Sequence, residues 1–263
     1  MRVMSYNVHG GIGMDGLYDL ERIVRTIAQA DADIVGLQEV DVHFGQRSRF
    51  EHMADRLADR LGMSVYFAPI YVLPPSEGRK EERQFGVALL SRLPIRKTAN
   101  HQLTRLSTQE VTALPEPKPG LLEAVLGAAE RQLRVYVTHL DYRTDPAIRW
   151  MQIREMLQLA GVHTDPVLVL GDFNARPDAP ELAPLFSAFP DSWTAVRADA
   201  AHTFPADQPD RKIDYILASG HMRTIRTYTI PGTASDHLPI VADLEFADRA
   251  DEESEETEEV KGR

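Results

Sequence analysis

The chain of 263 residues contains no cysteine. This absence excludes disulfide bonds and thiolate metal sites, and it gives no reason to expect an exported protein. Long apolar runs are also missing. None approaches the roughly 20 residues that cross a bilayer, so we expect no transmembrane segment. The first residues, MRVMSYNV, begin a strand-like pattern at once and leave no room for a signal peptide. We therefore expect a cytoplasmic protein.

Positive charge is scarce as well, because 29 Lys and Arg face 40 Asp and Glu, for a net charge of −11. The final sixteen residues, 248–263, hold eight acidic and three basic residues, a composition typical of a disordered tail. Residues 1–247 carry the remaining −6. This balance disfavours tight nonspecific binding to nucleic acid, although it is compatible with a local basic groove. We expect one domain over 1–247, followed by an acidic tail.

Short apolar runs alternate with amphipathic segments along residues 1–247. Apolar residues at helical spacing predict helices over 17–29, 50–60 and 146–159. The motif GAAERQ, between two apolar runs, predicts a hairpin. This mixture favours an α/β (α+β) fold with mixed sheets. Strands are expected at 2–6, 34–38, 64–67, 85–91, 121–126, 133–138, 167–171, 213–217 and 240–246.

Most of these strands are followed directly by a polar residue that can take part in chemistry. The stretch VLVLGDFNARPD places Asp172 and Asn174 immediately after a buried apolar run. Asp214 differs, since it lies near the beginning of its strand. Ligand sites in open sheets lie at such strand ends, so we expect one shared pocket. The other apolar segments lead to Asn7, Glu39, His139 with Asp141, and Asp236 with His237.

Several carboxylates cannot all remain ionised in one low-dielectric cleft without a compensating cation. Oxygen ligands in a chain without cysteine favour a hard ion, Mg2+ or Mn2+. Zn2+ would favour a spacing such as His-x-x-x-His, which the sequence lacks. A hard divalent ion suits phosphoryl chemistry, in which it neutralises developing charge. A histidine oriented by a carboxylate supplies a general base, and asparagine donates hydrogen bonds to phosphate.

Each residue also has a plain structural explanation. Asn7 alone is more often a turn residue, and Glu39 is equally a solvated strand end. A single histidine such as His237 is more often structural than catalytic, and Asp172 with Asn174 is compatible with an Asx-turn. The joint pattern favours function, because independent turn residues rarely follow so many buried strands with metal-ligand types.

Seven segments resemble, in order, those of the endonuclease/exonuclease/phosphatase superfamily: SYNVHGG, IVGLQEVD, FGVALLSRLPI, VTHLDYR, VLGDFNARP, RKIDYIL and SDHLPIVADL. Together they span residues 1 to about 246. The resemblance implies a four-layer sandwich, in which two mixed β-sheets pack face to face with helices outside. It also implies a divalent metal ion, usually Mg2+, and hydrolysis of phosphoester bonds by an activated water.

The resemblance also implies roles for individual residues. Glu39 would chiefly hold the ion, with Asp236 and Asn7 close by. Asn7 would contact the phosphate as well. His237 would be the general base or the transition-state stabiliser, and Asp214 would orient it.

The remaining roles concern water and phosphate. Asp172 would position or deprotonate the attacking water, while Asn174 and His139 would bind the phosphate. His9 and Asp141 lie beside motif positions. We expect His9 to line the pocket and Asp141 to be structural.

We expect a monomeric, metal-dependent phosphodiesterase or phosphatase, whose substrate the sequence does not disclose. A DNA or RNA nuclease of the same superfamily is the alternative, with Arg47 and Arg49 in its favour. The stretch 77–83, EGRKEER, adds basic residues but also three glutamates, so its net charge is zero. A non-catalytic scaffold is disfavoured by the intact set of acids, amides and histidines. Loops at 10–17, 71–84 and 105–120 are implied to set specificity.

Overall fold

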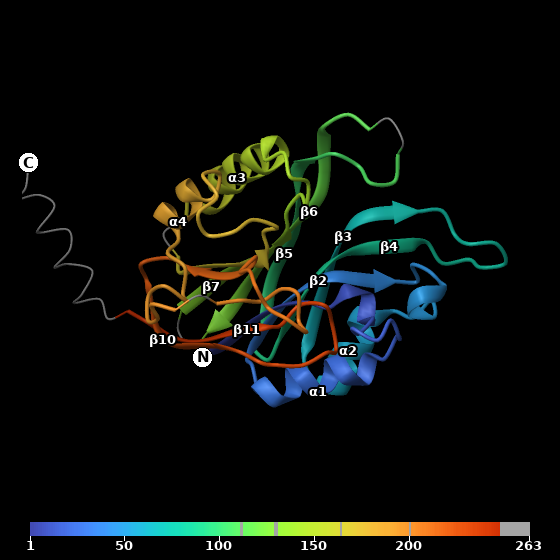
Figure 1. Ribbon diagram of the computed structural model, residues 1–263, viewed down its shortest axis with the longest axis horizontal. Helices are drawn as coiled ribbons and strands as arrows, with labels where there is room; N and C mark the ends of the chain where they lie inside the picture. Colours follow the sequence, from blue (N-terminus) through green and yellow to red (C-terminus); the bar gives the residue numbers. More distant parts are fainter. Residues whose placement is uncertain (111–112, 129–130, 164, 200, 248–263) are drawn as a thin grey trace, which may run out of the picture.

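In the computed structural model, two β-sheets pack face to face and helices cover their outer faces (Figure 1). The structure describes residues 1–110, 113–128, 131–163, 165–199 and 201–247. The helices are α1 (Leu20–Ala30), α2 (Met53–Leu61), α3 (Ala147–Ala160) and α4 (Ala183–Ala188). The strands are β1 (Arg2–Asn7), β2 (Ile34–Val42), β3 (Ser64–Leu73), β4 (Arg83–Ser91), β5 (Ile95–Arg105), β6 (Glu116–Ala128), β7 (Arg131–His139), β8 (Val167–Asp172), β9 (Asp214–Ala218), β10 (Met222–Thr229) and β11 (Ile240–Phe246).

Both sheets are mixed. The six-stranded sheet has the order β10-β11-β1-β2-β4-β3, and the five-stranded sheet has the order β5-β6-β7-β8-β9. In the first sheet β1 and β2 are parallel, and in the second β7 and β8 are parallel. The other neighbouring pairs are antiparallel. A parallel pair at the centre of each sheet places two strand ends at the same edge, where ligand sites form.

Apolar packing fills each of the three interfaces between the four layers. Side chains such as Leu89 and Leu168 form the core between the sheets. Helices α1 and α2 pack on the six-stranded sheet, because buried residues such as Ile23 and Ile27 recur at helical spacing. Helices α3 and α4 cover the five-stranded sheet, where Ile153 is buried. The four-layer sandwich predicted from the sequence is confirmed. Among the described residues, no helix is both long enough and apolar enough to span a membrane.

Gly36 of β2 lies where the two sheets approach each other closely. A Cβ atom at this position would lie 2.9 Å from Cδ1 of Leu170 and 3.2 Å from Cγ2 of Val137, both in the opposite sheet. Protein interiors are packed too densely to absorb such contacts without movement. The missing side chain of Gly36 therefore allows β2 to pack tightly against β7 and β8.

The predicted elements are present, but their bounds differ and some elements were not predicted. All nine predicted strands and all three predicted helices overlap observed ones, whereas β5, β10 and α4 were not expected. The supposed loop at 105–120 is shorter, because Arg105 ends β5 and β6 begins at Glu116. The supposed loop at 71–84 is likewise shortened by β3 and β4.

Some expectations fall outside the described residues. The predicted acidic tail, 248–263, is one of them. Residues 129–130 of the predicted hairpin turn are another, although the pairing of β6 with β7 confirms the hairpin itself.

Candidate active site

Three polar side chains stand in a row on adjacent strands of the five-stranded sheet. The parallel register of β7 and β8 puts His139 opposite Asp172. The antiparallel register of β8 and β9 puts Asp172 opposite Asp214. Because β9 runs in the other direction, the residue at its beginning reaches the same edge as the residues that end β7 and β8. The topology therefore explains why Asp214, at the start of its strand, joins residues at the ends of theirs.

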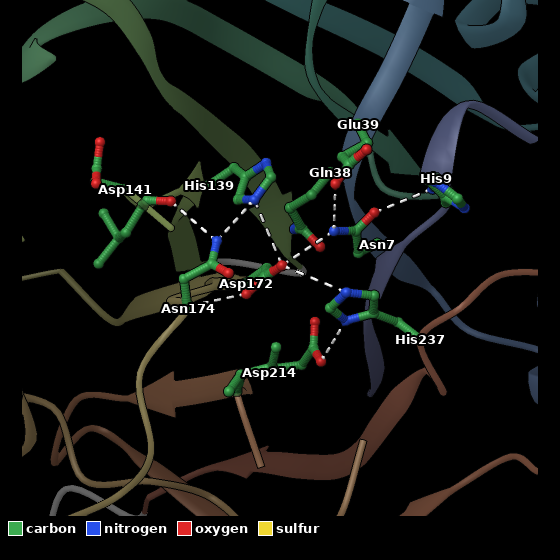
Figure 2. A network of polar contacts seen from close by, with 12 residues as sticks. Asn7, His9, Gln38, Glu39, His139, Asp141, Asp172, Asn174, Asp214 and His237 are labelled. Atoms are coloured by element: carbon green, nitrogen blue, oxygen red, sulfur yellow. Dashed lines mark hydrogen bonds and ion pairs between the residues drawn. The ribbon is translucent and has the colours of Figure 1, made fainter. Parts of the chain in front are cut away.

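His237 lies between two of these carboxylates (Figure 2). Its Nδ1 is 2.9 Å from Oδ2 of Asp214, and its Nε2 is 3.7 Å from Oδ2 of Asp172. Burial disfavours the charged imidazole, but the two carboxylates outweigh this effect and raise the pKa of His237 to about 10. In the metal-free site the ring is therefore protonated at neutral pH, and its Nε2 faces Asp172.

Asn7 connects the two sheets. Its Nδ2 donates to Oδ2 of Asp172 at 3.0 Å and to Oε1 of Glu39 at 3.1 Å. Its Oδ1 accepts a hydrogen bond from the backbone N–H of His9 at 3.0 Å. The amide is fully buried, so its orientation is fixed by these three contacts. A single side chain thus holds the carboxylate at the end of β8 beside the carboxylate of β2.

Glu39 occupies an irregular position in β2. The register between β2 and β4 shifts between Leu37 and Val40, which inserts one extra residue into β2. The backbone of Glu39 has a φ of 58°, an unusual value for a residue with a side chain. Burial raises the pKa of the Glu39 carboxyl, but His139 and the hydrogen bond from Asn7 outweigh it, so the pKa is lowered overall. The bulge therefore presents an ionised carboxylate to the site.

The segment after β8 turns back on itself. The backbone N–H of Asn174 donates to Oδ1 of Asp172 at 2.9 Å, and Asn174 has a φ of 51°. This is the Asx-turn considered from the sequence. The Asn174 amide donates to the Leu140 carbonyl at 3.1 Å and lies 2.9 Å from Nε2 of His139. The Asx-turn does not exclude a role for Asn174 in phosphate binding, because the turn itself brings the Asn174 amide next to His139.

Asp172 is the central member of the cluster. It is buried, with Nε2 of His139 at 3.4 Å and Nδ2 of Asn7 at 3.0 Å from its Oδ2. Burial and the neighbouring carboxylate of Asp214 raise the pKa of Asp172 above its usual value. A carboxyl group of this kind accepts a proton more readily than an exposed aspartate does.

The remaining predicted residues lie at the rim or away from it. Asp236 is more exposed, and its Oδ1 is 3.5 Å from Nδ1 of His9. His9 therefore lies beside the cluster. The Asp141 carboxylate pairs with Arg143, and its backbone N–H donates to Gln152 at 3.0 Å, so Asp141 joins the end of β7 to α3.

The donor set fits a hard divalent ion. Among the described residues, ligand atoms of Asp172, Asp214 and His237 lie within 4.8 Å of one another. Oδ1 of Asp214 is buried and accepts no hydrogen bond from any described residue. The sequence predicts Glu39 and Asp236 as metal ligands instead, and Asn7 connects the two sets, because its amide donates to both Asp172 and the ionised carboxylate of Glu39. Carboxylate oxygens clustered in this way could hold a divalent metal ion.

Two polar residues were not singled out from the sequence. Oγ of Ser235 donates to the backbone carbonyl of Asn7 at 2.7 Å and fixes the loop before His237. Gln38 is fully buried, and its Oε1 has no partner among the described residues. Both residues directly precede predicted site residues, which is the only signal in the sequence that could have found them.

Two of the basic residues considered for nucleic-acid binding contact other side chains of the protein. The Arg47 guanidinium donates to both oxygens of the buried Asp41, at 2.9 and 2.8 Å. Arg79 stacks over the ring of Phe50, 3.6 Å from its centroid. The charge of Arg47 is therefore balanced by Asp41.

Comparisons with known proteins identify the family and the fold. The model of the Endonuclease/Exonuclease/phosphatase family matches residues 4–237. An endonuclease/exonuclease/phosphatase structure from Beutenbergia cavernae is 23% identical, with a TM-score of 0.78 over 94% of this chain and 72% of its own. A mannosyl-6-phosphatase from Bacteroides thetaiotaomicron is 18% identical, with a TM-score of 0.69 over 94% of this chain and 100% of its own.

The human Nocturnin catalytic domain, solved with a bound sulfate anion, is 23% identical, with a TM-score of 0.68 over 94% of both chains. The comparison with curated proteins gave no significant match. At these identities the solved structures show a shared fold. The family match over nearly the whole chain shows more: the protein belongs to the endonuclease/exonuclease/phosphatase family.

Proposed function

We propose that the protein is a divalent-metal-dependent hydrolase of phosphoester bonds, a phosphodiesterase or phosphatase that uses an activated water. The observation that carries this proposal is the convergence of His139, Asp172 and Asp214 in one row, with His237 across them. Carboxylates, an imidazole and amide donors around one point are what phosphoryl transfer to water requires. The family includes phosphatases and nucleases, so the reaction class is compatible with the fold.

Glu39 and Asp236 would hold the metal ion, Mg2+ or Mn2+, with Asn7 beside them. When bound, such an ion neutralises the charge that develops on the phosphoryl oxygens. Asn7 orients Glu39, because its amide donates to the Glu39 carboxylate at 3.1 Å. The lowered pKa of Glu39 keeps this side chain ionised at neutral pH.

Asp172 would accept the proton of the attacking water, and His237 would stabilise the charge on the phosphate. Asp172 is held by Asn7 and by the backbone of Asn174, so its carboxylate has a fixed direction. Its raised pKa makes it a better proton acceptor. His237 is oriented by Asp214 and, when protonated, stabilises negative charge on the phosphate.

Asn174 and His139 would bind the phosphate, together with Asn7. The amide of Asn174 and the ring of His139 lie 2.9 Å apart at the ends of β7 and β8. Amide donors hold phosphate oxygens without a charge that titrates near neutral pH. Asn7 and Asn174 therefore contribute binding over a broad pH range.

The test is a panel of phosphoesters, assayed with Mg2+ and Mn2+ titrations. The panel contains 4-nitrophenyl phosphate, bis(4-nitrophenyl) phosphate, sphingomyelin, duplex DNA and RNA. We expect metal-dependent turnover of a small or lipid-derived ester, abolished by His237→Ala. Preferential cleavage of DNA or RNA would favour a nuclease instead. If no ester is turned over with either metal, the proposal is overturned and the non-catalytic scaffold is the remaining hypothesis.

A further inference from the structure

A recess of about 200 Å³ opens beside Glu39 and His139, and most of its lining has no role in the proposed reaction. Tyr71 and Phe85 form one wall, with their rings stacked at 6.3 Å between centroids and 26° between planes. Arg105 and Asp141 are also part of the lining. The recess therefore combines an apolar wall with one permanently charged arginine and with Asp141, whose carboxylate pairs with Arg143, and it lies immediately next to the candidate phosphate site.

The position of Arg105 is closely defined. It is the last residue of β5, and it is only 7% exposed. Its Nη1 donates to the carbonyl of His139 at 3.0 Å, and its Nη2 donates to the carbonyl of Gly120 at 3.0 Å. Gly120 has a φ of 128°, and a Cβ atom there would lie 2.8 Å from Nη2. Only glycine leaves room for the guanidinium, which is thereby fixed against the backbone of His139.

The charge of Arg105 has no counterion among the described residues. No carboxylate in the described ranges forms an ion pair with it, and its buried Nε has no hydrogen-bond partner there. The two acids nearest in its surroundings are engaged elsewhere, since Asp141 pairs with Arg143 and Glu155 accepts from Thr104. Burial lowers the pKa of Arg105 to about 10, so the side chain stays charged at neutral pH. A buried cation without a counterion destabilises the folded state. Such a cation is expected where the counterion is supplied by a bound ligand.

We infer that the recess receives the leaving group of the substrate, and that Arg105 binds a second anionic group carried by that leaving group. This inference rests on the proposed phosphoester hydrolysis and narrows its substrate class. The carbon skeleton of the leaving group lies against Tyr71 and Phe85, while the reacting phosphate lies near His139. The substrate is then a compact phosphoester with an additional negative charge.

Non-hydrolysable ligands test this inference without turnover. The probes are phenylphosphonate, its 3-carboxy and 4-carboxy derivatives, and 1,4-phenylenediphosphonate, each titrated calorimetrically in the presence of Mg2+. At least one of the three probes with a second anionic group should bind the wild-type protein about tenfold to a hundredfold more tightly than phenylphosphonate, the worth of a hydrogen bond to a charged group. Arg105→Gln should bind all four probes with similar affinity. Equal affinities in the wild type, or a preference that survives Arg105→Gln, would overturn the inference.

A second pair of variants covers the case in which Arg105→Gln fails to fold. Thr108 is exposed at the rim of the recess, where its backbone N–H lies 3.2 Å from the Tyr71 hydroxyl. Thr108→Glu adds a carboxylate to the lining of the recess that also includes Arg105, and it should abolish the preference for probes with a second anionic group. Gln109→Glu adds the same charge to the neighbouring exposed residue outside the recess lining and should retain the preference. An unchanged preference in Thr108→Glu contradicts the inference.

The activity experiment and the binding experiment test different proposals, so a negative result in one can be told apart from a negative result in the other. Absence of any phosphoester turnover contradicts the proposed hydrolase, whereas indifference to the second anion contradicts only the role of Arg105. Comparison of the carboxylate and phosphonate probes also identifies which anion the recess prefers.

Discussion

Nδ1 of His237 lies 2.9 Å from Oδ2 of Asp214, and this contact joins the two sheets of the sandwich. Asp214 begins β9 in the five-stranded sheet, while His237 is in the loop that leads to β11 in the six-stranded sheet. Both side chains are buried. A carboxylate in this position fixes the direction of the ring, so that Nε2 points to Asp172.

Replacement of His237 by alanine should lower kcat by about 10²- to 10⁴-fold or more, the usual worth of a positioned acid–base group. Steady-state kinetics on the preferred ester of the panel measures the loss. His221→Ala is the matched control, because His221 lies at the opposite end of β9 from Asp214. Full activity in His237→Ala would remove His237 from the mechanism.

Replacement of Asp214 by asparagine should shift the titration of His237 toward lower pH. Asp214 is the largest of the influences that raise this pKa to about 10, and asparagine keeps the shape without the charge. NMR titration of the His237 ring in the metal-free protein follows the change. Asp210→Asn, at an exposed pair with Arg211, should leave that titration where it is.

Replacement of Glu39 by alanine should raise the metal concentration needed for half-maximal activity and lower turnover. The ionised carboxylate is the principal group proposed to hold the ion, and the other carboxylate of β2, Asp41, pairs with Arg47. Metal titrations with Mg2+ and Mn2+ measure the effect. Glu77→Gln, in an exposed loop, is the control. An unaltered metal requirement in Glu39→Ala argues against this ligand.

The contribution of His237 to stability should decrease as pH rises. Its pKa is about 10 in the folded protein and 6.5 in its ordinary state. A raised pKa means that the protonated ring stabilises the fold fully below its ordinary pKa, and that this contribution is lost as pH rises through the folded value. The difference in free energy of unfolding between the wild type and His237→Gln should therefore fall between pH 6.5 and about 10. Urea denaturation in metal-free buffer measures this difference. A constant or rising difference would contradict the raised pKa of His237 in the folded protein.

Deletion of residues 248–263 should leave turnover unchanged. The segment is an acidic tail by composition, and the family match ends at residue 237. Kinetics of the protein truncated after residue 247 provides the comparison. Lost activity in a folded truncated protein would assign the tail a role in the reaction.

The missed strands explain what the sequence could and could not predict about the fold. β5 and β10 lie at the edges of their sheets, where only one neighbour is present. Their sequences, IRKTANHQLTR and MRTIRTYT, contain few apolar residues, since much of each strand remains exposed. The other strands, including the edge strands β3 and β9, carry apolar runs and were found. Arg105 was overlooked for the same reason, because it ends a strand that the pattern did not indicate.

The sequence indicates which residues belong to the candidate site more readily than it indicates how they are arranged. Residues such as Asn7 and Asp172 stand at strand ends, and that placement is visible in the sequence. The bulge at Glu39, where φ is 58°, is not visible in the sequence, because it depends on how β2 pairs with β4. The recess beside Arg105 depends likewise on the room left by Gly120.

The tight packing at Gly36 makes the thickness of the sandwich a determinant of the chemistry. Asn7 and Glu39 are attached to one sheet and Asp172 to the other, so the gap between sheets sets the span of their hydrogen bonds. An added methyl group at Gly36 would press on Leu170 and increase the distance between the two sheets below the candidate site. Relatives that carry a larger residue at this position would need a smaller one opposite it to preserve the same alignment.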